Sequence, residues 1–189
     1  MKQVPVGVSA RHIHLSQEHI AILFGKENGL SVKKDLSQPG QFAANETVRI
    51  EGPKKSLDKV RILGPARKES QLEISKTDSF YLGVQPPVRE SGDIIGTPGI
   101  KVVGPAGEVE LDKGVIIAAR HIHFHTSDAE KWGIQNKQLL KVRVNGERPL
   151  IFEDVIARVA DNYALDMHID TDEANAAGIN TCETAEIID

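Results

Sequence analysis

The sequence of 189 residues predicts a mainly β fold made of two small, related halves. Aromatic residues make up only 4% of the chain, whereas Val, Ile and Gly recur in short runs that turn residues close. This pattern is typical of a core carried by short strands rather than by long helices. A histidine motif near the start also returns in the second half, which indicates an internal duplication.

A short sequence motif occurs three times, at residues 48–53, 60–65 and 100–105, and marks three strand ends. In each copy apolar and charged side chains alternate with period two, and Gly-Pro follows. Because proline donates no hydrogen bond to a ladder, each Gly-Pro pair is expected to end a strand. Two further apolar strands are expected at residues 4–8 and 115–119, directly before the two histidine motifs.

Three short helices are expected, each beginning behind a Ser or Thr that can cap it and stopping at a Gly. They are residues 17–24 behind Ser16, the segment from Ser127 to Gly133, and the segment from Thr171 to Gly178. Ser127 and Glu130 have the spacing of a capping box. The Pro- and Gly-rich residues 85–93 and 96–99 predict a long ordered loop.

Composition excludes several classes of function. The 23 basic and 27 acidic side chains give a net charge of -4, so no overall field favours nucleic acid or an anionic membrane. With Cys182 as the single cysteine, neither an internal disulfide nor a thiolate-rich zinc site can form. No apolar run reaches the length of a membrane span, and the start lacks a secretory hydrophobic region. A reducing, cytoplasmic location is expected.

The repeated motif is Arg11-His12-Ile13-His14, echoed 109 residues later by Arg120-His121-Ile122-His123. On a strand, residues i and i+2 face the same side about 6.5 to 7 Å apart, so both imidazoles can bind one metal ion. Imidazole is the commonest metal ligand in proteins. We therefore interpret the two pairs as zinc ligands, with a hydrogen-bonded turn motif as the alternative.

Each pair needs a third ligand, because catalytic zinc typically keeps three protein ligands and one open position. His168 is the natural candidate for one pair, since residues 168–179 parallel 123–134. For the other pair, Glu73 lies on a strand-like segment, although spacing alone leaves it one of many acids. His19 and His125 fall inside or just before expected helices and are expected to be surface or supporting residues.

Arg67 is the basic residue of most interest, because it lies six residues before Glu73. If Glu73 meets a metal, the Arg67 guanidinium can hold a phosphate in the same place through paired donors. Lys34, Lys54 and Arg61 are further basic residues in this half. Most exposed cations only solvate a surface, which is the alternative for each of them.

Five ordered motifs identify a family that the chain resembles from end to end. They are residues 8–15, 64–73, 87–93, 119–123 and 167–175. With these motifs the chain resembles the PduL-type phosphate acyltransferases, also called phosphate propanoyltransferases.

The resemblance implies an enzyme that moves an acyl group, acetyl or propionyl, between coenzyme A (CoA) and inorganic phosphate with two zinc ions. Carried over by motif, one zinc is held by His12, His14 and Glu73 and the other by His121, His123 and His168. Arg67 binds the phosphate and is the catalytic residue. The implied CoA contacts are Val8, Ser9, Ala10, Lys54, Arg61 and Asn175.

The implied fold is two β-barrels capped by short helices, with the N-terminal strand joining the C-terminal half. The domains are then residues 11–118, and residues 1–10 together with 119–189; a tandem split into 1–95 and 96–189 is the alternative. Family members packaged in bacterial microcompartments carry an amphipathic extension, whereas here eleven residues precede His12. A cytosolic role is expected, with acyl-CoA and phosphate as partners, and a homodimer is left open.

The expected reaction needs no nucleophilic side chain, because a phosphate oxygen attacks the thioester directly and zinc stabilises the charge that develops. Cys182 lies in a polar C-terminal segment and is interpreted as structural or incidental. Two rival functions fit the same ligands. One is a dizinc hydrolase of an ester or phosphoester, which would release free acid, and the other is a non-enzymatic zinc-binding protein.

Overall fold

A computed structural model describes residues 2–25 and 29–188 and divides the chain into two compact units. Unit 1 contains the chain up to residue 10, residues 37–39 and the chain from residue 119 onwards. Unit 2 contains residues 11–36 and 40–118. Strands dominate both units and the helices are short, which confirms the predicted fold class.

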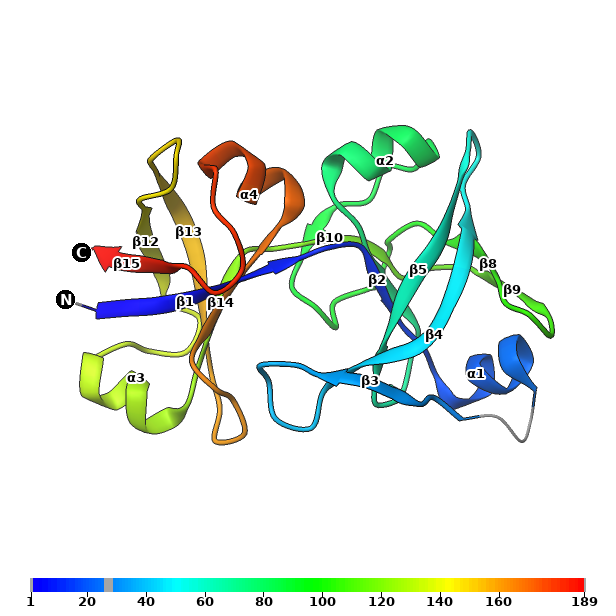
Figure 1. Cartoon of the computed structure of the whole chain (residues 1–189), viewed down its shortest axis with the longest axis horizontal. Helices are drawn as coiled ribbons and strands as arrows, with labels where there is room; N and C mark the ends of the chain where they lie inside the picture. Colours follow the sequence, from blue (N-terminus) through cyan, green and yellow to red (C-terminus); the bar gives the residue numbers. More distant parts are fainter. Residues whose placement is uncertain (1, 26–28, 189) are drawn as a thin grey trace. The chain divides into compact units, whose positions relative to one another are not determined.

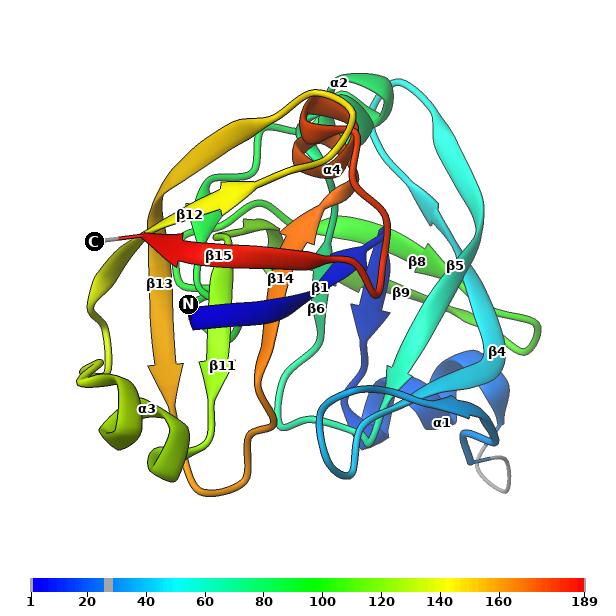
Figure 2. The ribbon, with the colours of Figure 1, turned by 60° about the vertical axis from the view of Figure 1, so that its left-hand side comes forward.

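Unit 1 is a closed barrel, and Figure 2 shows its strands from the side of the chain ends. Around the barrel the order is β1 (Lys2–Ser9), β14 (Asp166–Asp170), β11 (His121–Phe124), β13 (Leu150–Val159), β12 (Leu139–Val144) and β15 (Thr184–Ile188). The ring closes because β15 also pairs with β1. Unit 1 also contains two helices, α3 (Thr126–Trp132) after β11 and α4 (Thr171–Ala177) after β14.

Unit 2 is a curled sheet, whose strands and helices are labelled in Figure 1. Its order is β7 (Val88–Arg89), β10 (Val115–Ala118), β6 (Gln71–Glu73), β2 (His12–His14), β5 (Ser56–Gly64), β4 (Phe42–Glu51), β8 (Ile100–Val103) and β9 (Glu108–Leu111). Strand β3 (Val32–Asp35) pairs with β4, and the helices are α1 (Gln17–Phe24) and α2 (Lys76–Leu82). Strands β4, β5 and β8 end at or next to the glycines of the three Gly-Pro pairs, as predicted.

The strands that precede the two histidine motifs are exchanged between the units. Strand β1 runs into the first motif, yet it pairs with β14 and β15 in unit 1. Strand β10 runs into the second motif, yet it pairs with β6 and β7 in unit 2. The chain therefore changes units directly before Arg11 and again between Ala118 and Ala119.

Each unit has its own apolar core, and the middle residue of each histidine motif belongs to it. Ile13 is fully buried in the core of unit 2, and Ile122 is fully buried in the core of unit 1. Because neighbouring residues of a strand face opposite sides, an isoleucine that points into the core turns both flanking histidines to the other face. Packing of the core thus fixes the direction in which the imidazoles point.

The helices correct three details of the sequence prediction. Helix α1 has the predicted bounds and is capped by Ser16. Helix α3 is capped not by Ser127 but by His125, whose ring accepts a hydrogen bond from the Ser127 amide. Helix α4 is capped by Asp170 rather than Thr171. Helix α2, behind Ser75, was not predicted.

Within residues 2–25 and 29–188, no helix has the length and apolar character needed to span a membrane.

Candidate metal centres

The first cluster of metal-ligand side chains lies in unit 2 and joins His12, His14 and Glu73. Strand β2 pairs antiparallel with β6, so that His12 lies directly opposite Glu73. Glu73 places Oε2 3.5 Å from His12 Nε2 and Oε1 3.9 Å from His14 Nε2. All three side chains are buried. The sheet therefore brings together the pair and the acid that the sequence proposed.

Charge and burial favour the protonation states that metal binding requires at His14 and Glu73. Burial lowers the pKa of the His14 imidazole well below its ordinary value, and the charges of His12 and Arg67 lower it further. Burial alone would raise the pKa of the Glu73 carboxyl, but its interactions with His12 and His14 hold that pKa well below the usual range. A neutral imidazole and an ionised carboxylate are the forms that bind metal.

The second cluster lies in unit 1 and joins His121, His123 and His168. Strand β11 pairs antiparallel with β14, so that His121 lies opposite His168. The rings pack edge to face, with centroids 4.7 to 5.2 Å apart. Nδ1 of His121 lies 2.8 Å from the carbonyl oxygen of Ala119, to which it can donate a hydrogen bond. That bond leaves Nε2 of His121 for a metal ion.

Three residues around His168, namely Asp166, Ser37 and Gly7, define its surroundings. Asp166, buried and two residues earlier on the same strand, has Oδ2 3.0 Å from Nε2 of His168. The Ser37 hydroxyl donates to the same carboxylate oxygen. On the adjacent strand β1, Gly7 lies beside His168, and a β-carbon there would come within 3.2 Å of both Asp166 and His168. A glycine at this position leaves room for the imidazole.

Both clusters suit zinc by chemistry and by spacing. In each cluster the ligand atoms lie within 4.8 Å of one another. Zinc bonds of about 2.0 to 2.2 Å in a tetrahedron place ligand atoms about 3.3 to 3.6 Å apart, close to the 3.5 Å between His12 Nε2 and Glu73 Oε2. Imidazole nitrogens and a carboxylate are also among the ligands that zinc prefers. Each cluster would hold an ion with three protein ligands and leave a fourth position open.

Arg67 is linked to the first cluster through Ser91. Its Nη1 donates to the Ser91 hydroxyl oxygen at 3.1 Å, and the Ser91 hydroxyl donates to Oε1 of Glu73 at 2.8 Å. The Gln71 side-chain amide donates to both of these oxygens, at 2.8 Å to Ser91 and 2.7 Å to Glu73. A single hydrogen-bonded residue, Ser91, therefore links the guanidinium to the carboxylate of the candidate metal ligand Glu73.

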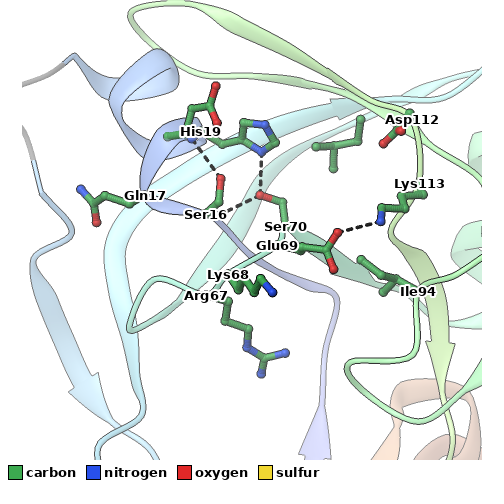
Figure 3. Close-up of a pocket in the computed structure, with 12 residues that line it drawn as sticks. Ser16, Gln17, His19, Arg67, Lys68, Glu69, Ser70, Ile94, Asp112 and Lys113 are labelled. Carbon is green, nitrogen blue, oxygen red and sulfur yellow. Dashed lines mark hydrogen bonds and ion pairs between the residues drawn. The ribbon is translucent and has the colours of Figure 1, made fainter.

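A pocket of about 350 Å³, which Arg67 helps to line, lies at the start of helix α1 (Figure 3). Within it, the Ser70 hydroxyl accepts a hydrogen bond from the Ser16 amide and lies 2.7 Å from Nδ1 of His19. Figure 3 shows the Arg67 guanidinium pointing away from His19 and Ser70. The backbone amide of Arg67 donates to the carbonyl of Leu15, next to His14. These bonds hold the Arg67 loop against the end of β2.

The predicted CoA residues fall in both units. In unit 1, Ser9 lies beside Asp170, the cap of helix α4, and Asn175 is exposed on that helix. In unit 2, Arg61 lies beside His12 and donates to the carbonyls of Ala44 and Asn45.

Lys54 is not close to Arg61. It lies in the turn at the tip of the β4–β5 hairpin, after Glu51 of β4 and before Ser56 of β5. At about 3.3 Å per residue, the seven residues from Lys54 to Arg61 span roughly 20 Å. The structure thus brings Arg61, but not Lys54, to the strand that carries His12.

Sequence reasoning missed the residues that surround the ligands. Asp166 and Gln71 each lie two residues before a third ligand and contact it. Period two along a strand could have suggested both, because residues i and i+2 share a face. Ser91 comes from a loop far along the chain, and only folding brings it to Glu73.

Comparison with known proteins matches nearly the whole chain. Residues 5–180 fit the model of the phosphate propanoyltransferase family. A phosphate propanoyltransferase of Thermotoga maritima is 56% identical over 185 residues, covering 97% of this chain and 88% of its own length. A phosphate propanoyltransferase of Lachnoclostridium phytofermentans is 56% identical over 95% of this chain and 84% of its own. One of Listeria monocytogenes is 48% identical over 98% and 87%.

Proposed function

The chain belongs to the phosphate propanoyltransferase family and is an acyltransferase, and from this premise we propose that it transfers acetyl or propionyl between CoA and phosphate with two zinc ions. One observation gives the main support for the proposed binding of zinc. Each of the two Arg-His-Ile-His copies meets a third metal-ligand side chain, at equivalent strand positions, within its own unit.

The proposed reaction is a direct transfer. A phosphate oxygen attacks the thioester carbonyl, forming a carbon–oxygen bond, while the carbon–sulfur bond breaks and its electron pair stays on the CoA sulfur. A bound zinc ion supplies Lewis-acid stabilisation of the carbonyl oxygen or of the leaving thiolate. No side chain has to carry the acyl group. Cys182, exposed just before β15, is not part of either cluster.

Arg67 holds the phosphate in this proposal. Its guanidinium can grip two oxygens at once, and its hydrogen bond to Ser91 sets it beside Glu73. Its positive charge also lowers the pKa of His14, which indicates that Arg67 lies within electrostatic reach of the cluster. A phosphate held there is close to the site where a zinc ion would bind, and proximity of this kind supplies a large part of a catalysed rate.

The CoA contacts of the proposal are Val8, Ser9, Ala10, Arg61 and Asn175. Ser9 and Arg61 support it best, because each lies directly beside a strand of one cluster. Lys54 is retained with the least support, given its place at the hairpin tip.

A coupled assay tests the proposal. Acetyl-, propionyl- and butyryl-CoA are each supplied with phosphate, and free thiol and acyl phosphate are followed together. Equal amounts of thiol and acyl phosphate are expected, with the acyl preference given by the rates. Thiol accompanied by free acid, without acyl phosphate, would identify a dizinc hydrolase instead. Elemental analysis of the same active preparation should give about two zinc ions per chain, and activity without metal would overturn the zinc assignment.

A further inference from the structure

The arginine that opens each histidine motif makes an ion pair with an acid on a helix. Arg11 donates two hydrogen bonds to Asp78, from Nε to Oδ2 at 2.8 Å and from Nη2 to Oδ1 at 2.7 Å. Arg120 donates from Nη1 to Oε1 of Glu173 at 3.0 Å and from Nε to the carbonyl of Glu153 at 2.7 Å. Each pair lies within one unit.

The two acids occupy equivalent places relative to the third metal ligand. In unit 2, Ser75 caps helix α2 two residues after Glu73, and Asp78 is the third residue of that helix. In unit 1, Asp170 caps helix α4 two residues after His168, and Glu173 is the third residue there. In both units the third ligand is therefore followed at the same intervals by the helix cap and then by the acid. The third ligand is a glutamate in one unit and a histidine in the other, and the acid is an aspartate in one and a glutamate in the other.

Each arginine thus joins the two strands whose side chains form one cluster. It directly precedes the histidine pair, while its acid partner stands five residues after the third ligand. The ladder between these strands is short in both units, because β2 and β6, like β11 and β14, pair at three positions. The bidentate Arg11–Asp78 pair, and the bonds of Arg120 to Glu173 and to the Glu153 carbonyl, add a second connection to each short ladder and restrict the separation and angle of its strands.

We propose that Arg11–Asp78 and Arg120–Glu173 are positioning pairs, each holding the histidine strand and the third-ligand strand of its own cluster at the spacing that zinc requires. The inference rests on the proposed binding of zinc. Simple stabilisation by an ion pair is the plain alternative, because the Arg11 side chain is 43% exposed but that of Asp78 is only 6% exposed, and the pair is bidentate. The shared spacing in both units is what favours a role in positioning.

The test is the rate at which each zinc ion leaves the protein loaded with zinc. A chromophoric chelator in excess follows release from the parent, from Arg11→Gln and from Arg120→Gln. The double substitutions His12→Ala with His14→Ala, and His121→Ala with His123→Ala, assign each kinetic phase to a cluster. Arg11→Gln should release the ion of the His12 cluster roughly 10- to 100-fold faster and leave the other ion unchanged, and Arg120→Gln should do the reverse.

Further variants separate positioning from stability. Arg49→Gln and Arg143→Gln, at ion pairs of the same units remote from the clusters in sequence, should leave both release rates unchanged. Arg11→Lys keeps the charge but not the paired grip, and should release zinc at an intermediate rate even if Arg11→Gln folds poorly. Urea unfolding of the metal-free proteins measures stability separately.

Two results would overturn the inference in distinguishable ways. If the parent binds two zinc ions and both arginine variants release them at parental rates, the pairs do not position the ligands, while the proposed function stands. Equal acceleration of both ions by one variant would likewise show a general loss of stability. If the parent binds no zinc, the metal part of the proposed function fails and the positioning role fails with it.

Discussion

Replacing Arg67 tests whether its guanidinium holds the phosphate substrate. Arg67→Ala removes the positive charge and its hydrogen bond to Ser91, and Arg67→Lys keeps the charge but not the paired donors. Both variants should weaken phosphate binding while leaving the binding of acyl-CoA nearly intact. The reason is that, of the two substrates in the proposal, Arg67 contacts only phosphate.

The size of the effect follows from the surroundings of Arg67. Loss of a charged hydrogen-bonded pair costs about 2 to 5 kcal/mol when the pair is fully desolvated. Arg67 is only partly buried, which favours the lower end, about 2 to 3 kcal/mol. Arg67→Ala should therefore raise the KM for phosphate roughly 30- to 150-fold. Arg67→Lys, which loses about one charged hydrogen bond, should raise it roughly tenfold.

Initial rates measured at varied phosphate and saturating acyl-CoA give the result, and the reverse series gives the KM for acyl-CoA. Arg49→Ala is the matched control, because Arg49 pairs with Glu51 on the same strand and makes no contact with the Arg67–Ser91–Glu73 chain of bonds. An unchanged phosphate KM in Arg67→Ala would refute the assignment, and Arg89, on strand β7, would be the next arginine to examine.

Four other outcomes are expected. Substitution of both His12 and His14 by alanine should remove one zinc ion of two and most activity, as elemental analysis and the acyl phosphate assay would show. Cys182→Ser should retain parental activity with intersecting double-reciprocal plots, whereas parallel lines or acyl label on the protein would indicate a covalent intermediate. Gly7→Ala should push on His168 and lower zinc content at the unit 1 cluster, and full zinc retention would count against the close packing seen there. Ile122→Val should lower the free energy of unfolding by about 1 kcal/mol in urea, because the side chain is fully buried, and no change would contradict its place in the core.

The sequence predicted the local features well because their causes are local. Proline lacks a donor, so Gly-Pro marks the ends of β4, β5 and β8 within a few residues. Alternation identified β4, β5 and β8, and identical His-x-His copies indicated two ligand pairs on one face each. The helix caps were less secure, because Ser127 and Thr171 are also of the type that caps helices, whereas His125 and Asp170, one or two residues earlier, accept the capping hydrogen bonds.

What completes each ligand cluster depends on pairing between distant strands, and spacing along the chain does not contain it. In the sequence Glu73 is one of many acids, and only the pairing of β6 with β2 places it opposite His12. The exchange of β1 and β10 between the units likewise follows from which sheet buries each strand best.

By itself, then, the sequence determined the mainly β class, the duplication and the two histidine pairs. Tertiary structure decided their environment: Ser91 beside Glu73, Asp166 beside His168, and an acid for each motif arginine. The physical reason is that alternation and capping act over a few residues, whereas strand register is chosen by the burial of whole faces in a common core.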